Sequence, residues 1–281
     1  MTSQGAATRA PGAVELLEIA VEAVRRAAQA AVELRAEGIR EVSTKSSLTD
    51  VVTAADRAVE RQVVADLRAR RPTDRILGEE YGEARSGGDA DAGEHLVRWV
   101  LDPIDGTVNY LYGLAPYAVS LAAEVDGTIV CGVVHEVTTG QEWTAVRGGG
   151  AFRAGRRLAG SDVTELGQAL VATGFAYEPA RRAHQARVVA GLLPEIRDIR
   201  RLGSAAVDLC LAAEGRVDAY FEKGLNAWDH AAGGLVAAEA GLVVSGLAGA
   251  PPGPDFVLAC PPALRPALHD RLVALDASGG P

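Results

Sequence analysis

Residues 97–109 read Val-Arg-Trp-Val-Leu-Asp-Pro-Ile-Asp-Gly-Thr-Val-Asn, so an apolar run leads directly into two aspartates. The run at residues 97–101 predicts a buried strand that ends where the carboxylates begin. Pro103 has a fixed φ and no N–H donor, and Gly106 permits a tight approach, so we expect the chain to turn sharply here. Two carboxylates three residues apart on such a turn can face one point.

Carboxylate oxygens with a backbone carbonyl between them are the hard ligands that Mg²⁺ prefers. For Asp102 and Asp105 alone, however, a turn with solvated aspartates is the simpler interpretation. Three further segments concentrate acidic, hydroxyl and small residues, at 45–56, 78–80 and 228–233. Each also has a simple explanation: Asp229 is positioned to cap a helix, worth about 1 kcal/mol, and Glu79 with Glu80 fits a solvated loop.

The combination of these acids changes the interpretation. If Glu79, Asp102, Asp105 and Asp229 converge, each like-charge pair at 4 Å costs about 4 kcal/mol at an effective dielectric constant near 20. Divalent cations would remove that repulsion. A carboxylate site with two metal ions is a common device for in-line phosphoryl displacement. Convergence would therefore indicate phosphate chemistry.

The rest of the chain alternates helix and strand signals. Apolar residues recur at three- and four-residue steps in residues 13–37 and predict a helix buried through Val14, Leu17, Val21, Val24, Ala28 and Val32. A second helix is expected at 54–70, with Val59, Val63 and Leu67 on one face, so that two helices precede the first strand. Residues 82–93 are expected to form a surface loop.

Three segments, 117–125, 128–137 and 142–146, predict an antiparallel meander. Strands and helices alternate after Gly160. The pattern predicts an α/β protein of the α+β type in two lobes, residues 1–160 and 161–281, that form one compact unit. The first lobe would carry most of the clustered acids, and the second would carry Asp229.

Composition narrows the class of protein. The 281 residues include 28 Lys+Arg against 37 Asp+Glu, for a net charge of −9, with 48% apolar residues. Such a chain is neither disordered nor fibrous, and its acidity argues against binding nucleic acid over a broad basic surface. Three cysteines without a metal-binding spacing predict reduced thiols, and no secretory signal or membrane span is recognisable. We expect a cytoplasmic protein. Only Lys45 and Lys223 are lysines.

The four acidic segments together resemble the inositol monophosphatase family. They occur in the family's order at residues 45–56, 78–80, 102–109 and 228–233, the last continuing to Gly241. Residues 203–205 and 220–222 look like the family's substrate-side segments. The resemblance spans most of the chain and is closest to bacterial inositol-1-monophosphatases.

This resemblance implies a layered α/β/α/β/α sandwich, a homodimer, two or three Mg²⁺ ions and inhibition by Li⁺. It implies that the metal ligands are Glu79, Asp102, the Ile104 carbonyl, Asp105 and Asp229. Thr107 and Asp56, together with Glu79, would orient the attacking water. The implied substrate-binding residues are Lys45, Asp105, Gly106, Thr107, Gly203, Ser204, Ala205, Glu222 and Asp229. Gly106 and Thr107 would offer backbone N–H groups to the phosphate.

The implied function is hydrolysis of inositol monophosphate, a small phosphorylated polyol, by a phosphoric monoester hydrolase. Departures from the family pattern lie on the substrate side, where Lys223 and Asn226 follow Glu222 and residues 174–177 lack a serine that some relatives carry. Histidinol phosphate, fructose 1,6-bisphosphate and a nucleotide 3′-phosphate therefore stay open as alternative substrates. A non-catalytic regulator that associates with the transcription machinery and an inactive homologue are further alternatives. His135, His184 and His230 are interpreted as ordinary residues.

Overall fold

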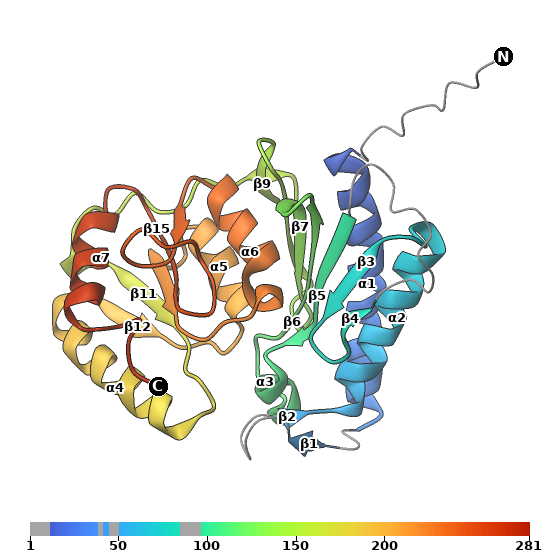
Figure 1. Ribbon diagram of the computed structural model, residues 1–281, viewed down its shortest axis with the longest axis horizontal. Coiled ribbons are helices and arrows are strands. Elements are labelled where there is room, and N and C mark those ends of the chain that lie inside the picture. Colours follow the sequence, from blue (N-terminus) through green and yellow to red (C-terminus); the bar gives the residue numbers. More distant parts are fainter. Residues whose placement is uncertain (1–11, 39–41, 45–50, 85–96) are drawn as a thin grey trace.

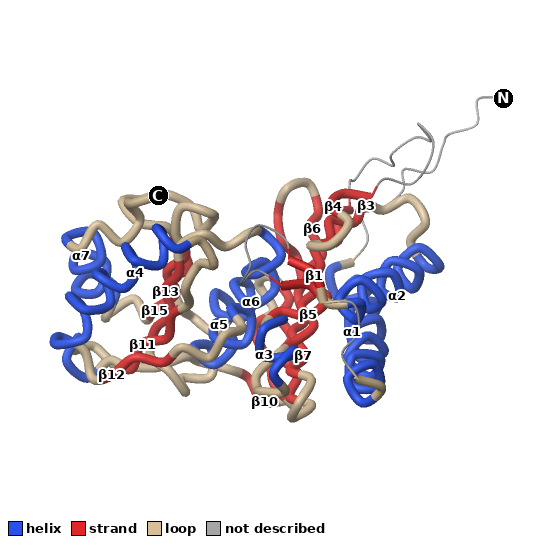
Figure 2. Tube along the Cα trace, turned by 90° about the horizontal axis from the view of Figure 1, so that it is seen from below, coloured by secondary structure: helices blue, strands red, loops and turns tan. Residues whose placement is uncertain are grey.

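The computed structural model describes residues 12–38, 42–44, 51–84 and 97–281. Five layers alternate between helices and sheets, and Figures 1 and 2 show the same order from two directions. The helices are α1 (Ala13–Ala36), α2 (Ala54–Arg70), α3 (Thr107–Tyr112), α4 (Pro179–Leu192), α5 (Ala205–Ala213), α6 (Ala227–Glu239) and α7 (Arg265–Ala274), with 3₁₀ turns η1 (Leu166–Gln168) and η2 (Leu193–Glu195). Helices α1 and α2 cover one sheet, α5 and α6 lie between the sheets, and α4 and α7 cover the other. The predicted layered sandwich is confirmed.

The first sheet has eight strands in the order β10-β9-β8-β7-β6-β5-β3-β4. Its strands are β3 (Arg75–Gly78), β4 (Gly82–Ala84), β5 (Val97–Asp105), β6 (Ala118–Val125), β7 (Thr128–Glu136), β8 (Gln141–Val146), β9 (Gly150–Arg153) and β10 (Arg156–Arg157). The pairing of β3 with β5 is parallel and the others are antiparallel. The predicted meander is confirmed as β6, β7 and β8.

Two predictions about the early strands were wrong. A two-residue ladder of β1 (Ser43–Thr44) and β2 (Val51–Val52) lies between the first two helices, so α2 does not precede the first strand. The expected loop at 82–93 begins instead with β4, which pairs with β3; residues 85–93 lie outside the described residues. Strands this short carry too little apolar periodicity to be recognised.

The second sheet has five strands in the order β12-β11-β13-β15-β14. They are β11 (Leu170–Thr173), β12 (Asp198–Arg200), β13 (Ala219–Glu222), β14 (Val243–Ser245) and β15 (Val257–Cys260). β11 pairs in parallel with β12 and β13, while β15 is antiparallel to both of its neighbours. The chain passes from the first sheet to the second between β10 and β11, where the proposed lobe boundary falls.

The two N-terminal helices differ in the side chains that they bury: valines and a leucine in α2, and mainly alanines in α1. Val59, Val63 and Leu67 of α2 are fully buried, as predicted. In α1 the buried face is rotated from the predicted one: Val14 and Val32 are 61% and 48% exposed. The buried positions are instead Leu16, Ile19, Ala20, Ala23, Val24, Ala27, Ala28 and Ala31. Alanines have a weak hydropathy signal, but they let a helix approach its neighbours closely.

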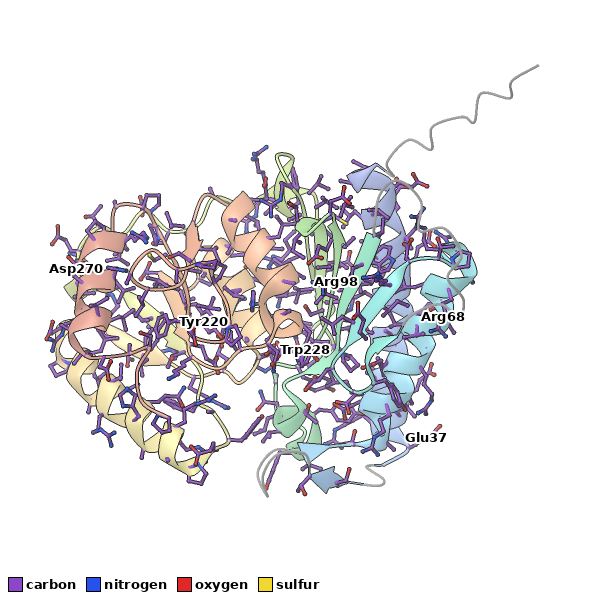
Figure 3. The ribbon with its side chains drawn as sticks, viewed as in Figure 1. Glu37, Arg68, Arg98, Tyr220, Trp228 and Asp270 are labelled. Atoms are coloured by element: carbon purple, nitrogen blue, oxygen red, sulfur yellow. The ribbon has the colours of Figure 1, made fainter. Side chains whose placement is uncertain are left out.

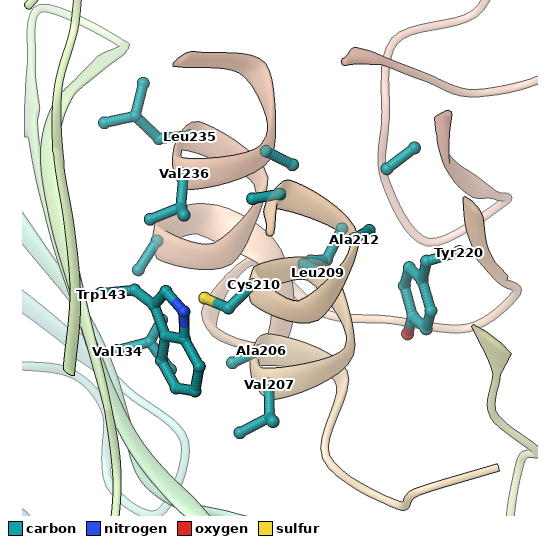
Figure 4. Close-up of a cluster of buried hydrophobic side chains, with 14 of the residues drawn as sticks. Val134, Trp143, Ala206, Val207, Leu209, Cys210, Ala212, Tyr220, Leu235 and Val236 are labelled. Carbon is teal, nitrogen blue, oxygen red and sulfur yellow. The ribbon is translucent and has the colours of Figure 1, made fainter. Parts of the chain in front are cut away.

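The middle helical layer holds the two sheets together. Trp228, in the first turn of α6, lies at the junction of the two halves in Figure 3. Figure 4 shows Val134 and Trp143 of the first sheet against Val207 and Cys210 of α5. Burying a large apolar side chain contributes about 1.5–3 kcal/mol, so this shared core fixes how the halves are placed. The three cysteines are free and buried, as expected, and no helix among the described residues is long and apolar enough to cross a membrane.

Candidate active site

A cavity of about 350 Å³ opens between the two halves of the molecule. Predicted site residues that line it are Glu79, Asp102, Ile104, Asp105, Gly106, Thr107, Gly203, Ser204, Ala205, Glu222 and Asp229. Asp56 lies behind this wall, within hydrogen-bond distance of Thr107. Lys45 lies outside the described residues. The fold therefore brings the separate segments of sequence to one place, while the roles of these residues stay predictions.

The cavity has two ends of different character. We call Glu79, Asp102, Asp105 and Asp229 the carboxylate end. The mixed-charge end comprises charged residues of both signs that also line the cavity: Glu178, Arg181, Arg201, Asp208, Glu222 and Lys223.

Strand β5 carries two of the acids of the carboxylate end. The strand does not end at Leu101 as expected but continues to Asp105, with a register shift against β6 between Asp102 and Asp105. A bulge re-aims side chains while the ladder continues, so both carboxylates can turn toward the cavity. Asp102 Oδ1 also accepts a hydrogen bond of 3.1 Å from the Ile104 N–H, which fixes the carboxylate against its own turn.

Gly106 joins β5 to α3 in a conformation that other residues rarely adopt. Its φ is +95°, and a Cβ there would lie 3.0 Å from the Gly203 carbonyl oxygen and 3.1 Å from that of Pro116. Glycine is required both for the backbone angle and for the close approach of two loops. Gly106 thereby lets the β5 turn meet the loop before α5.

Thr107 connects this turn to α2. Its Oγ1 lies 3.1 Å from Asp56 Oδ1 and 3.1 Å from the Ile104 carbonyl oxygen. Asp56 is fully buried, and its Oδ2 accepts from the Thr53 N–H at 2.8 Å and from the Thr53 hydroxyl at 2.6 Å. These bonds are part of the capping box of α2. The helix cap thus holds the carboxylate that faces Thr107.

Asp105 is held from the other half of the molecule. Its Oδ2 accepts from the Ser204 hydroxyl at 2.6 Å and from the Ala206 N–H at 2.7 Å, both at the start of α5. Asp229 has the capping role expected of it, but its Oδ2 accepts from the N-cap residue Asn226 at 2.5 Å rather than from the first turn. Both acids are therefore oriented by helix starts of the second half.

Charge accumulates at the carboxylate end. Burial, and then the charges of Glu79, Asp105 and Asp229, raise the pKa of Asp102 well above its ordinary value. Burial raises the pKa of Asp105 to about 6, although the hydrogen bonds from Ser204 and Ala206 oppose the shift. The pKa of Asp229 is raised by burial and then by the charges of Glu79 and Asp105. An acid cluster of this kind is stabilised by a cation.

The donor set fits a hard divalent cation, because it consists of carboxylate oxygens beside the Ile104 carbonyl. Within residues 12–38, 42–44, 51–84 and 97–281, no three His, Cys, Asp or Glu side chains are grouped tightly enough to hold one ion as they stand. The chemistry of the donors thus supports a metal.

Glu222 is the central acid of the mixed-charge end. The Tyr220 hydroxyl donates to Glu222 Oε2 at 2.6 Å, and Figure 3 places Tyr220 within the second half. Burial raises the pKa of Glu222 to about 7, opposed by that hydrogen bond and by Arg201. A Cβ on Gly174 would lie 1.9 Å from Glu222 Oε2. Gly174 therefore leaves the space that the Glu222 carboxylate occupies, within the stretch 174–177.

Several residues of the site were missed from sequence. Glu60 is 1% exposed, and its carboxylate accepts from the Glu80 and Tyr81 N–H groups at 2.9 and 3.1 Å, which holds the turn that carries Glu79. In the sequence, Glu60 could have been found as an acid next to Val59, on the apolar face of the predicted helix α2. Arg181, Arg201 and Asp208 also line the cavity and had no local motif to mark them.

Comparison with known proteins agrees with this geometry. Residues 13–276 match the family model described as the inositol monophosphatase family. An inositol-1-monophosphatase of Mycobacterium leprae is 48% identical over 227 residues, covering 78% of this chain and 76% of the relative. Nus factor SuhB of Escherichia coli is 40% identical over 236 residues, or 83% and 86% of the two chains.

Among solved structures, the extragenic suppressor protein suhB of Bartonella henselae superposes with a TM-score of 0.82 at 33% identity, covering 92% of this chain and 98% of that one. Sequence and fold agree along nearly the whole length. The chain belongs to the inositol monophosphatase family.

Proposed function

We propose that the protein is a Mg²⁺-dependent phosphomonoesterase that hydrolyses inositol monophosphate to inositol and phosphate. The observation that carries the proposal is the cavity itself: four carboxylates at one end, the Thr107–Asp56 pair beside them, and Glu222 at the other end. Family membership and the name of the mycobacterial relative support the reaction class.

The carboxylate end would hold two or three Mg²⁺ ions. Their ligands would be Glu79, Asp102, the Ile104 carbonyl, Asp105 and Asp229. When bound, the cations supply the charge that balances the phosphoryl oxygens and that makes a water nucleophilic near neutral pH. Gly106 and Thr107 would position the phosphate with backbone N–H groups at the turn after β5.

Thr107 and Asp56 are suited to orient the attacking water. Asp56 is fixed by two donors from Thr53, so its second oxygen is held toward Thr107. When the Thr107 hydroxyl donates to Asp56, the Oγ1 lone pairs stay available to accept from a water. Glu79, held by the turn that Glu60 ties down, would accept the second hydrogen of that water. The chain thereby supplies a base and an orientation.

Glu222 would accept hydrogen bonds from the hydroxyls of the alcohol, beside Gly203, Ser204 and Ala205. We propose a homodimer and inhibition by Li⁺ on the strength of the family resemblance. Histidinol phosphate, fructose 1,6-bisphosphate and nucleotide 3′-phosphates are the alternative substrates of the same machinery.

Turnover of a panel of these phosphate esters by the purified protein at fixed Mg²⁺ tests the proposal. We expect the highest kcat/KM for inositol monophosphate. Preference for another ester would change the substrate and leave the reaction class intact, whereas no release of phosphate from any ester would contradict the proposed activity.

A second candidate function comes from the relatives named Nus factor SuhB, which suggest association with the transcription machinery. That role does not need the carboxylate end. Copurification with RNA polymerase that survives Asp105→Ala would support it, and its absence from both the wild type and the variant would argue against it.

A further inference from the structure

The mixed-charge end carries cations that a neutral alcohol does not require. Arg181, Arg201 and Lys223 line the cavity together with the acids Glu178, Asp208 and Glu222. Arg201 lies near enough to lower the pKa of Glu222 and to oppose the rise at Asp208. Arg201 is therefore engaged by Glu222 and Asp208. Backbone hydrogen bonds from Ala180 and Arg181, and then the charge of Arg181, lower the pKa of Glu178. Lys223 is left to be explained.

Lys223 and Arg181 are both held by the C-terminal segment, residues 276–281. Lys223 Nζ donates to the Gly279 carbonyl at 2.6 Å and to the Gly280 carbonyl at 3.1 Å. Arg181 Nε donates to the Pro281 carbonyl at 3.0 Å. In Figures 1 and 2 the C-terminus lies beside α4, which carries Arg181. The Gly279 and Gly280 carbonyls hold Lys223 without neutralising its charge.

The C-terminal segment is itself anchored to the second half. Ala277 is 3% exposed within the core that also contains Leu268 and Leu272, and its N–H donates to the Leu272 carbonyl at 3.0 Å. The Asp276 carbonyl lies 2.8 Å from His184 Nε2. Lys223 therefore loses rotational freedom before any ligand arrives, which is the condition for strong recognition by a flexible side chain.

An ammonium has three N–H groups and no acceptor. Among the described residues Lys223 makes the two bonds to the C-terminal segment, which leaves one N–H for a ligand, and the residue lines the cavity. A neutral polyol can be held by the acceptor Glu222, whereas fixed donors with full charge favour anionic oxygens.

We propose that Lys223, held by the C-terminal segment, is a specificity-determining residue that selects phosphate esters whose alcohol carries a second anionic group. This inference rests on the proposed phosphatase activity. It adds a substrate preference to that activity: neutral alcohols use Glu222, and anionic alcohols use Lys223.

Two matched pairs of substrates test the proposal at fixed Mg²⁺. Glycerol 2-phosphate and 2-phosphoglycerate differ by a carboxylate, and fructose 1-phosphate and fructose 1,6-bisphosphate differ by a phosphate. Lys223→Met should lower kcat/KM for the anionic member of a pair by about tenfold through KM, the effect of one charged hydrogen bond, and leave the neutral member nearly unchanged. Lys223→Arg, which keeps the charge, is the matched control and should retain most of the preference.

The two pairs also distinguish a carboxylate from a phosphate as the second anionic group. If Lys223→Met lowers kcat/KM for the anionic member of only one pair, the anionic group of that pair is the preferred one. An equal change for both members of each pair, or no change, would overturn the assignment of Lys223. Inositol monophosphate is assayed alongside. Failure of the wild type to hydrolyse it and all four esters would contradict the proposed function, whereas hydrolysis of inositol monophosphate but of none of the four would overturn the assignment of Lys223.

The holding role of the C-terminal segment has its own test. Gly280 has a φ of +78°, and a Cβ there would lie 2.6 Å from His184 Cγ, so Gly280→Ala should displace the segment. Gly249 has a φ of +83° with no atom within 4 Å of a Cβ, so Gly249→Ala adds similar backbone strain without a clash. We expect Gly280→Ala alone to reduce the preference for anionic alcohols. A preference unchanged in Gly280→Ala would overturn the holding role.

Discussion

The two ends of the cavity are built in different ways. At the carboxylate end, Asp102 and Asp105 lie within four residues of each other on strand β5. Backbone N–H groups at a turn and at the start of a helix hold their oxygens. At the mixed-charge end, Glu222 is held by a tyrosine, and Lys223 by carbonyls more than 50 residues away in sequence. The carboxylate end is fixed by hydrogen bonds that reach the carboxylate oxygens from both halves of the molecule. The mixed-charge end is fixed by a tyrosine two residues from Glu222 and by backbone carbonyls of the C-terminal segment.

This difference suggests a division of labour. Backbone geometry holds charges that must stay in one arrangement, as a cation site and a phosphate require. A side chain such as Lys223, which is held only through the C-terminal segment, can be replaced without changing that arrangement, as selection among alcohols requires. Variants at the carboxylate end should therefore lower turnover, and variants at the mixed-charge end should change substrate preference.

The largest effect is expected at the carboxylate end, for Asp102→Asn. The amide keeps the shape but removes a charge from the proposed cation site, so kcat should fall by about a thousandfold or more, since a bound cation contributes several kcal/mol. Steady-state phosphate release measures this. Asp162→Asn, at an exposed acid outside the cavity, is the matched control and should behave as the wild type. Near-normal turnover in Asp102→Asn would contradict the claim that the carboxylate end determines turnover.

An intermediate effect is expected at the mixed-charge end, for Glu222→Gln. The amide loses a charged acceptor for substrate hydroxyls, so KM for inositol monophosphate should rise by about tenfold while kcat changes little. The comparison substrate is p-nitrophenyl phosphate, whose alcohol has no hydroxyl beyond the ester oxygen, and Glu165→Gln is the exposed control. A drop in kcat for both substrates would place Glu222 with the carboxylate end instead.

The smallest effect is expected away from both ends, at Glu142 of β8. Burial opposes ionisation of this carboxyl, but hydrogen bonds from His135 and Arg25 outweigh it and lower the pKa from 4.5 to about 2. A lowered pKa stabilises the fold above the unfolded value and loses that effect as pH falls from about 5 toward 2. Glu142→Gln should thus cost about 1–2 kcal/mol at pH 7, after allowance for solvent screening of a half-buried pair.

Urea unfolding of the wild type and Glu142→Gln at pH 7 and pH 3.5 measures this difference, which should shrink at the lower pH. Activity at pH 7 should be unchanged. A stability difference that does not depend on pH would show that packing, rather than the ionised carboxylate, is responsible.

Predictability from sequence follows the same division. The α2 face with Val59, Val63 and Leu67 and the meander of β6, β7 and β8 were predicted, because strong apolar periodicity marks them. The α1 face was misplaced because alanines form much of it, and β4 was missed because it has three residues. Strand β5 was ended too early, since Pro103 and two aspartates conceal a bulge within a continuing strand.

Within the site, the residues of the carboxylate end were found because each belongs to a short motif. Glu60, Arg181 and Asp208 were missed because their partners are distant in sequence: Glu60 contacts a turn 20 residues away, and Arg181 a carbonyl 100 residues away. Lys223 was noticed for the rarity of lysine and as a departure from the family pattern beside Glu222. Contacts of this kind need the fold before they can be recognised.

The most direct test of the account is the rate of phosphate release from inositol monophosphate as a function of free Mg²⁺, starting from chelator-treated protein. The account predicts no measurable hydrolysis without a divalent cation and saturable recovery as Mg²⁺ is added, with the recovery lost in Asp102→Asn. Hydrolysis at the same rate in the presence of excess chelator, or full recovery in Asp102→Asn, would contradict the claim that the carboxylate end holds the catalytic cation.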